Sequence, residues 1–103
     1  ETRDCTYVDD TVQGIILAAG KKSAENQLFN LGTGKETKIL KIAKIILNLT
    51  KSDSKIVFKP RRTFDPITRR KMDISNARKL LGYSPEIKIE SGLQATYEWF
   101  LNR

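Results

Sequence analysis

An arginine-rich stretch, residues 60–73, carries the side chains of this sequence that are best suited to chemistry. Five cations fall within the eleven residues 61–71, and four of the five are arginines. Pro60 and Pro66 prevent a helix from running through it, because proline lacks a backbone donor and pushes the preceding residue out of helical space. We therefore expect a loop with short strands at its ends. Guanidinium groups bind phosphate or carboxylate oxygens two at a time, so this loop is either an anion-binding surface or a solvated basic loop.

The composition of the 103-residue chain excludes several classes of function. The chain has no histidine and a single cysteine, Cys5, so an internal disulfide, histidine acid–base catalysis and a zinc site of the usual ligands are excluded. We expect no metal site and a reducing, cytoplasmic location. No apolar run is long enough to span a membrane. The net charge of +7 favours anionic partners: phosphates, nucleotides, nucleic acid or a membrane surface.

Short strands are predicted to alternate with helices along the chain. Runs of β-forming and apolar residues predict strands over residues 3–8, 28–31 and 56–58. Apolar residues at helical spacing predict helices over residues 11–21, 38–50, 74–81 and 90–101. In the first of these helices the apolar residues are Val12, Ile15, Ile16 and Ala19. The pattern predicts an α/β (α+β) fold in a single domain over residues 1–103, a small sheet of short strands flanked by about four helices.

Residues with capping chemistry flank these helices. Asp9 or Asp10 is expected to cap the first helix, Thr37 the second and Asp73 the third, because their side-chain oxygens accept hydrogen bonds from the first backbone amides. Gly82 is expected to end the third helix, since glycine adopts the left-handed conformation at little cost.

The chain shows no catalytic constellation. Gly32 and Gly34 form a G-x-G after an expected strand, but a dinucleotide fingerprint needs a third glycine where this chain has Thr37. These glycines therefore predict a tight turn and no cofactor site. None of the tyrosines is followed four residues later by a lysine, and Asp9 and Asp10 are typical capping residues. We expect no catalytic residue in this chain, which leaves a binding surface.

Five segments, in order along the chain, resemble the NAD-dependent epimerase/dehydratase family. This family comprises extended short-chain dehydrogenase/reductases and includes UDP-glucose 4-epimerase-like enzymes. The matching segments are Arg-Asp-Cys-Thr-Tyr-Val-Asp-Asp at 3–10, Phe-Asn-Leu-Gly-Thr-Gly at 29–34, Pro-Arg-Arg with Asp at 60–65, the Asp-Ile-Ser-Asn-Ala to Gly-Tyr-Ser-Pro run at 73–85, and Glu-Ser-Gly-Leu with Thr and Trp at 90–99. Each segment alone is a weak signal, but five at family spacing are a specific one.

The resemblance implies the substrate-binding part of an NAD(P)-dependent nucleotide-sugar epimerase or dehydratase. Arg3 and Arg62 would hold the diphosphate of a nucleoside-diphosphate sugar, and Asp65 would bond a hydroxyl of the sugar nucleotide or steady Arg62. Arg70 is a further expected substrate contact. The sequence departs from the family pattern at three places. Cys5 stands where an aromatic residue is usual, the residue before Asp65 is not the usual glycine, and Arg70 stands where a tyrosine or another arginine is common.

The resemblance also implies what this chain does not supply. The family's cofactor-binding Rossmann domain, with its Tyr-x-x-x-Lys pair, would precede residues 1–103. NAD(P) would bind mainly to that domain, and this chain alone would carry no cofactor and show no turnover. In this chain alone, the apolar surface that contacts the Rossmann domain in the parent enzyme would be exposed. The parent enzyme is expected to act in carbohydrate metabolism as an isomerase or dehydratase, as a homodimer, with no membrane partner.

Two alternatives stay open at this point. One is a stand-alone basic module that binds nucleic acid through the arginine loop and the lysines of the second helix, Lys38, Lys41 and Lys44. Binding of that kind would weaken steeply with salt and would not be competed by a UDP-sugar. The other is a chain that folds but binds no ligand by itself.

Overall fold

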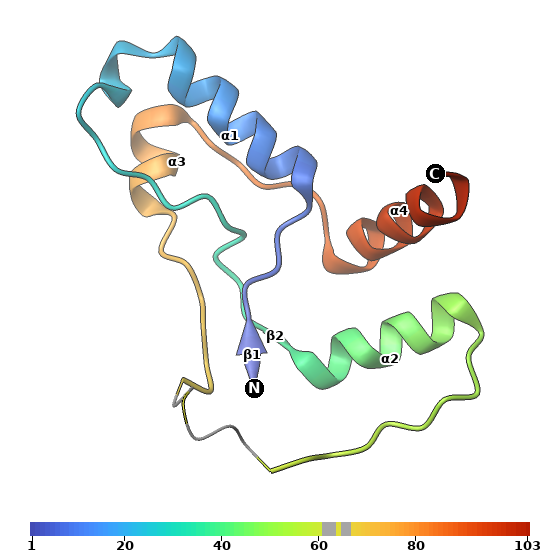
Figure 1. The fold of residues 1–103 in the computed structure, drawn as a ribbon. Coiled ribbons are helices and arrows are strands. Elements are labelled where there is room, and N and C mark those ends of the chain that lie inside the picture. The colour runs from blue at the N-terminus through green and yellow to red at the C-terminus, as the bar shows by residue number, and fades with distance from the viewer. Residues whose placement is uncertain (61–63, 65–66) are drawn as a thin grey trace.

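The computed structural model describes residues 1–60, 64 and 67–103. These residues form four α-helices, one short 3-10 helix and a two-stranded antiparallel sheet (Figure 1). The helices are α1 (Val8–Gly20), η1 (Lys22–Ala24), α2 (Ile39–Thr50), α3 (Ser75–Leu81) and α4 (Ile89–Asn102). The strands are β1 (Thr2–Arg3) and β2 (Thr37–Lys38), which pair with Thr2 opposite Lys38. The structure confirms the predicted class, a small sheet with four helices.

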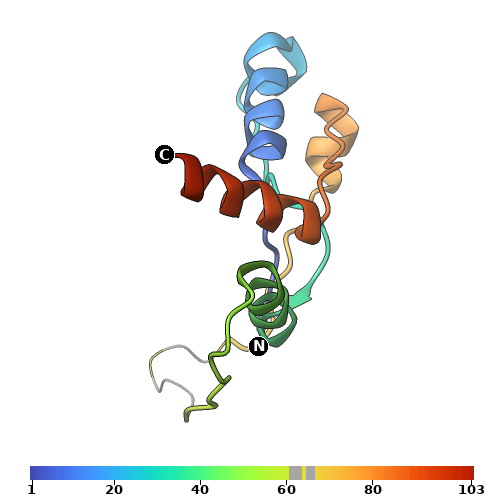
Figure 2. The same ribbon diagram turned by 90° about the vertical axis from the view of Figure 1, so that its right-hand side faces the viewer.

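The elements form an open arrangement of two helix pairs. Helix α1 packs beside α3, and α2 packs beside α4, as both views show (Figures 1 and 2). The radius of gyration is 16.3 Å, whereas a compact domain of about 100 residues has one of about 13 Å. The chain therefore exposes much of the surface of each element.

None of the helices in the described ranges is both long and apolar enough to cross a membrane.

The core lies between α1 and α3. Its fully enclosed members are Ile74, Ala77, Leu81 and Tyr83, and side chains from α1 and from residues 29–31 pack against them. The Tyr83 hydroxyl donates a hydrogen bond of 2.7 Å to the Gly32 carbonyl, so this buried polar group is satisfied. The φ of Gly82 is +68°, which confirms it as the left-handed residue that ends α3.

Helix α1 has two apolar faces, and only one is covered. Gly14 is buried so closely against Leu31 that a Cβ there would lie 2.7 Å from its side chain. The opposite stripe consists of four residues that are each at least 44% exposed: Val8, Val12, Ile15 and Ile16. Their spacing places them on one side of the helix. The periodicity thus predicted a helix correctly, but its apolar stripe lies at the surface and contributes nothing to the core. It is the kind of exposed apolar face that the resemblance predicts.

The predicted strands are largely wrong. The first strand was predicted over residues 3–8, but β1 is Thr2–Arg3, so only Arg3 of the predicted strand is paired. Helix α1 begins at Val8, three residues earlier than predicted. Residues 28–31 and 56–58 form no strand; Leu28 and Phe58 are 83% and 78% exposed. A β-former adopts a strand where a neighbouring strand can pair with it. Neither segment pairs with a strand of the described residues, although Phe29 and Leu31 pack against the core. The other three predicted helices are confirmed to within one residue at each end.

The expected caps have other roles. The N-cap of α1 is Tyr7, and Asp10, only 7% exposed, accepts hydrogen bonds from the backbone amides of Glu86 and Ile87. Thr37 lies in β2 and does not cap α2. The N-cap of α3 is Ile74, so Asp73 lies one residue before the expected position, although its carboxylate accepts the Ser75 amide at the start of the helix. The Asp10 carboxylate therefore links segments that are distant along the chain.

Candidate functional site

The carboxylate of Asp4 joins three segments next to the candidate site. One oxygen accepts the amide and the hydroxyl of Thr33, and the other accepts the amides of Gly34, at 2.9 Å, and Met72, at 3.2 Å. Partial burial alone would raise the pKa of Asp4, but the hydrogen bonds from these three residues outweigh it and hold the pKa below its usual value. The charged carboxylate of Asp4, next to β1, therefore holds together the turn at residues 32–34 (the glycine turn) and the segment before α3.

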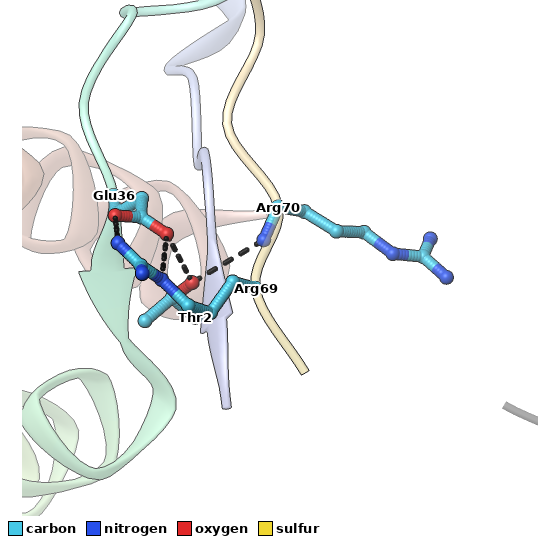
Figure 3. A network of polar contacts seen from close by, with 4 residues as sticks. All are labelled: Thr2, Glu36, Arg69 and Arg70. Carbon is cyan, nitrogen blue, oxygen red and sulfur yellow. Dashed lines mark hydrogen bonds and ion pairs between the residues drawn. The ribbon is translucent and has the colours of Figure 1, made fainter. Parts of the chain in front are cut away.

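A second polar network fixes the arginine segment beside β1 (Figure 3). Both oxygens of Glu36 accept from Arg69, Oε1 from Nε at 2.9 Å and Oε2 from Nη2 at 2.7 Å. The Thr2 hydroxyl donates to Glu36 Oε1 at 2.9 Å and accepts the Arg70 amide at 3.2 Å. The Thr2 amide in turn donates to the Thr68 carbonyl at 2.8 Å. The fork of Arg69, with the Thr2 hydroxyl, lowers the pKa of Glu36 to about 2.

An open pocket of about 650 Å³ lies along this segment. It is lined by four cations and a carboxylate that is already occupied by backbone amides, together with two apolar residues: Arg3, Arg69, Arg70, Lys71, Asp4, Ile67 and Met72. Figure 3 shows that Arg70 extends away from Glu36, whereas Arg69 turns back to it. The pocket thus concentrates positive charge on one surface, which suits an anion.

The pocket brings together two of the four predicted site residues. Arg3 and Arg70 both line it, although 67 positions separate them along the chain. The guanidinium of Arg3 also donates to the Thr2 carbonyl at 2.7 Å and lies 3.4 Å from the Glu1 carboxylate. Arg62 and Asp65 lie outside the described residues.

The glycine turn does not fit a cofactor phosphate. A phosphate-binding turn offers free backbone amides to its ligand, but the amides of Thr33 and Gly34 donate to Asp4. A Cβ on Gly32 would lie 2.7 Å from the sulfur of Met72, so this glycine is needed for close packing. The turn is therefore structural. Among the residues that the structure describes, no three side chains of metal-ligand type lie close enough together to hold a metal ion.

Two curated relatives match nearly the whole chain. Protein MJ1055 of Methanocaldococcus jannaschii is 38% identical over 99 residues, which are 96% of this chain and 30% of the relative. The UDP-glucose 4-epimerase of Mycolicibacterium smegmatis is 33% identical over 103 residues, 100% of this chain and 32% of the relative. No family model matches the chain.

Solved structures give the same result. The epimerase Mth375 of Methanothermobacter thermautotrophicus has a TM-score of 0.95 at 38% identity, over 99% of this chain and 30% of that one. The UDP-glucose 4-epimerase of Thermotoga maritima with UDP-glucose has a TM-score of 0.88 at 36% identity, over 98% of this chain and 32% of that one. The UDP-glucuronic acid 4-epimerase of Bacillus cereus with UDP-glucuronic acid and NAD has a TM-score of 0.86 at 29% identity, over 99% and 32%.

This chain matches a C-terminal part of the NAD-dependent epimerase/dehydratase family. It spans about 30% of the length of the first relative and of the first structure, so the match is to one portion of a longer enzyme. The family resemblance found in the sequence is confirmed.

The nucleic-acid alternative gains no support. Of the lysines that would carry it, Lys41 lies 3.2 Å from the Glu90 carboxylate, so part of the predicted cationic stripe is neutralised.

Sequence reasoning missed the residues that organise the site. Asp4, Glu36 and Thr2 were not among the predicted site residues, yet they fix the segments on which the arginines lie. Asp4 lies inside a segment that resembles the family, which was a signal that could have been used. Glu36 gave none, because its partner Arg69 lies 33 positions away and no local pattern joins them.

Proposed function

We propose that this chain is the substrate-binding part of an NAD-dependent sugar-nucleotide epimerase or dehydratase and that it binds the diphosphate of a UDP-sugar. The observation that carries the proposal is that Arg3 and Arg70 line one cationic pocket in a chain whose relatives are named for UDP-sugar chemistry. Arg62 and Asp65 are included as predicted contacts from the resemblance.

The chemistry of the ligand suits the pocket. A diphosphate presents paired oxygens, which match the fork of a guanidinium. Each charge-assisted hydrogen bond of this kind contributes about 1.5–3 kcal/mol. Binding the diphosphate anchors the substrate equally in the ground state and the transition state, so it serves affinity and orientation. The bonds made and broken are at the sugar, and no residue of this chain is assigned to that chemistry.

The proposal places NAD and the catalytic groups on a cofactor-binding domain. A related enzyme of Bacillus cereus was solved with NAD, and the relatives are about three times as long as this chain, which leaves room for such a domain. The glycine turn is not available to the cofactor, as its amides are occupied. The exposed apolar stripe of α1 is the proposed contact surface for that domain. The purified 103-residue chain should then show no turnover with a UDP-sugar and NAD.

Calorimetric titration of the chain with UDP tests the proposal. Arg70→Ala should weaken UDP binding about tenfold, as expected from the loss of one charge-assisted contact. Arg103→Ala is the matched control, because it removes the same charge from a residue that stacks on Phe100 outside the pocket. Uridine, which lacks the diphosphate, should bind equally weakly to all three proteins. The proposal is wrong if UDP gives no heat, or if Arg70→Ala and Arg103→Ala weaken binding equally.

A further inference from the structure

We propose that Glu36 is a positioning residue for this anion site: by holding Arg69, it directs Arg70 toward the pocket. The inference rests on the proposed function and extends it to a residue that does not line the pocket. It is carried by the network of Thr2, Glu36 and Arg69 (Figure 3).

Two adjacent arginines line the pocket, and the network directs them differently: Glu36 holds Arg69, whereas Arg70 extends away from Glu36. Arg69 and Arg70 are identical in chemistry, so a shift of the segment by one residue would place Arg70 against Glu36 and Lys71 where Arg70 now lies. Neighbouring side chains on an extended chain point to opposite sides. Glu36 holds the Arg69 fork with both oxygens, and the Thr2 hydroxyl accepts the Arg70 amide. These contacts select one register, in which Arg70 extends away from Glu36.

The energetics favour a positioning role over a stabilising one. The Arg69 side chain is 75% exposed. Exposed ion pairs contribute little to folding, because solvent screens them and ordering two long side chains costs entropy. The Glu36–Arg69 pair would therefore add little to stability, while its two-point geometry still determines the direction of Arg69. Removing the pair should change the direction of the Arg70 side chain much more than it changes the stability of the fold.

Glu36→Gln distinguishes positioning from a simple effect of charge. The substitution removes a negative charge near a cationic pocket, so a purely electrostatic account predicts tighter binding of UDP. Positioning predicts weaker binding, by roughly fivefold, because Arg70 loses its fixed direction. Arg69→Lys keeps the charge and loses the fork, and it should weaken UDP binding to a similar extent. Glu90→Gln breaks the exposed pair with Lys41 outside this pocket and is the matched control, which should leave UDP affinity unchanged.

A double-mutant cycle decides whether Glu36 acts through Arg70. UDP affinity is measured for the wild type, Glu36→Gln, Arg70→Ala and the double variant. If Glu36 acts by directing Arg70, Glu36→Gln should have almost no further effect once Arg70 is alanine. An equal loss in both backgrounds, or tighter binding of UDP by Glu36→Gln, would overturn the inference. All variants should melt within a few degrees of the wild type, and a much lower Tm for Glu36→Gln would assign it a structural role instead.

A measurement without ligand keeps this test separate from the proposed function. Hydrogen exchange at the Arg70 amide reports whether that amide stays bonded to Thr2. Glu36→Gln should accelerate this exchange, while the Glu36-independent amide of Met72, which donates to Asp4, should be unaffected. If UDP binds to none of the proteins, the proposed function fails, and the positioning role is then tested by hydrogen exchange at the Arg70 amide alone. Unchanged exchange at Arg70 in Glu36→Gln would refute it.

Discussion

Replacing Asp4 with asparagine should strongly destabilise this chain. Asparagine keeps one acceptor oxygen but puts an NH2 group where the carboxylate has its second oxygen. In the native geometry that NH2 would face two backbone donors, the amides of Gly34 and Met72. Two hydrogen bonds to a charged acceptor are thereby lost, each worth about 1.5–3 kcal/mol in other proteins. We expect a loss of about 3 kcal/mol, since such contributions are not fully additive.

Thermal and urea unfolding followed by circular dichroism at pH 7 measure this loss. A change of this size should lower the Tm of a 103-residue chain by more than about 10 °C. Asp9→Asn is the matched control, because Asp9 is exposed in the first turn of α1 and its charge acts mainly on the helix dipole. That effect is worth only about 0.3–1 kcal/mol. Equal stability of Asp4→Asn and Asp9→Asn would refute this role of the Asp4 carboxylate.

Acid titration provides a second check on Asp4. Its pKa in the folded chain lies below the ordinary value of 3.8, so the ionised form stabilises the fold at every pH above that value. As the pH falls below 3.8 the unfolded chain takes up the proton first, and the stabilisation is lost. The stability difference between the wild type and Asp4→Asn should therefore be constant from pH 7 to about pH 5 and shrink below pH 3.8. A gap that stays constant in acid would contradict the charged role.

Two further predictions follow from burial and from the Glu36 network. Leu81→Ala, at a fully buried position, should lower the free energy of unfolding in urea by about 2–5 kcal/mol. Ile16→Ala, at a position that is 60% exposed, should change it by no more than about 0.5 kcal/mol. Comparable losses for the two variants would mean that α1 packs through the face that carries Ile16. The pKa of Glu36 is lowered from 4.5 to about 2 by Arg69 and Thr2, so its contribution is complete above pH 4.5 and is lost as the pH falls toward 2. Because the Arg69 side chain is 75% exposed, this contribution to stability is small, and the test is an NMR titration of the Glu36 carboxyl. Its midpoint should lie well below 4.5, and an ordinary midpoint would count against the pairing.

Local sequence patterns predicted the helices because a helix is closed by its own backbone. The apolar repeat of residues 38–50 and the glycine at 82 define α2 and the end of α3 without reference to the rest of the chain. The strands could not be predicted in the same way. Leu28 and Phe58 belong to typical strand sequences, but a strand exists only where a partner offers hydrogen bonds, and within residues 1–60, 64 and 67–103 no strand pairs with either segment.

The candidate site was predictable in its residue types but not in its geometry. The arginines in residues 60–73 left both an anion-binding surface and a solvated basic loop open, and Arg3 was found only through the family resemblance. The directions of the two arginines depend on contacts across 33 positions, from Glu36 to Arg69, and across 68, from Thr2 to Arg70. No periodicity in the sequence reports such contacts.

We propose that stability and ligand binding depend on different ends of the same segment, residues 68–72. At residue 72 the chain is tied to the glycine turn by the partly buried, ionised Asp4, a contact that is strong because its donors are backbone amides with fixed positions. At residues 68–70 the chain is tied to β1 by exposed contacts that contribute little to folding but set the direction of the arginine side chains. Asp4→Asn should therefore impair folding, and ligand binding only as a consequence, while Glu36→Gln should impair binding in a chain that remains folded. A variant pair that failed to separate in this way would mean that the segment moves as one unit.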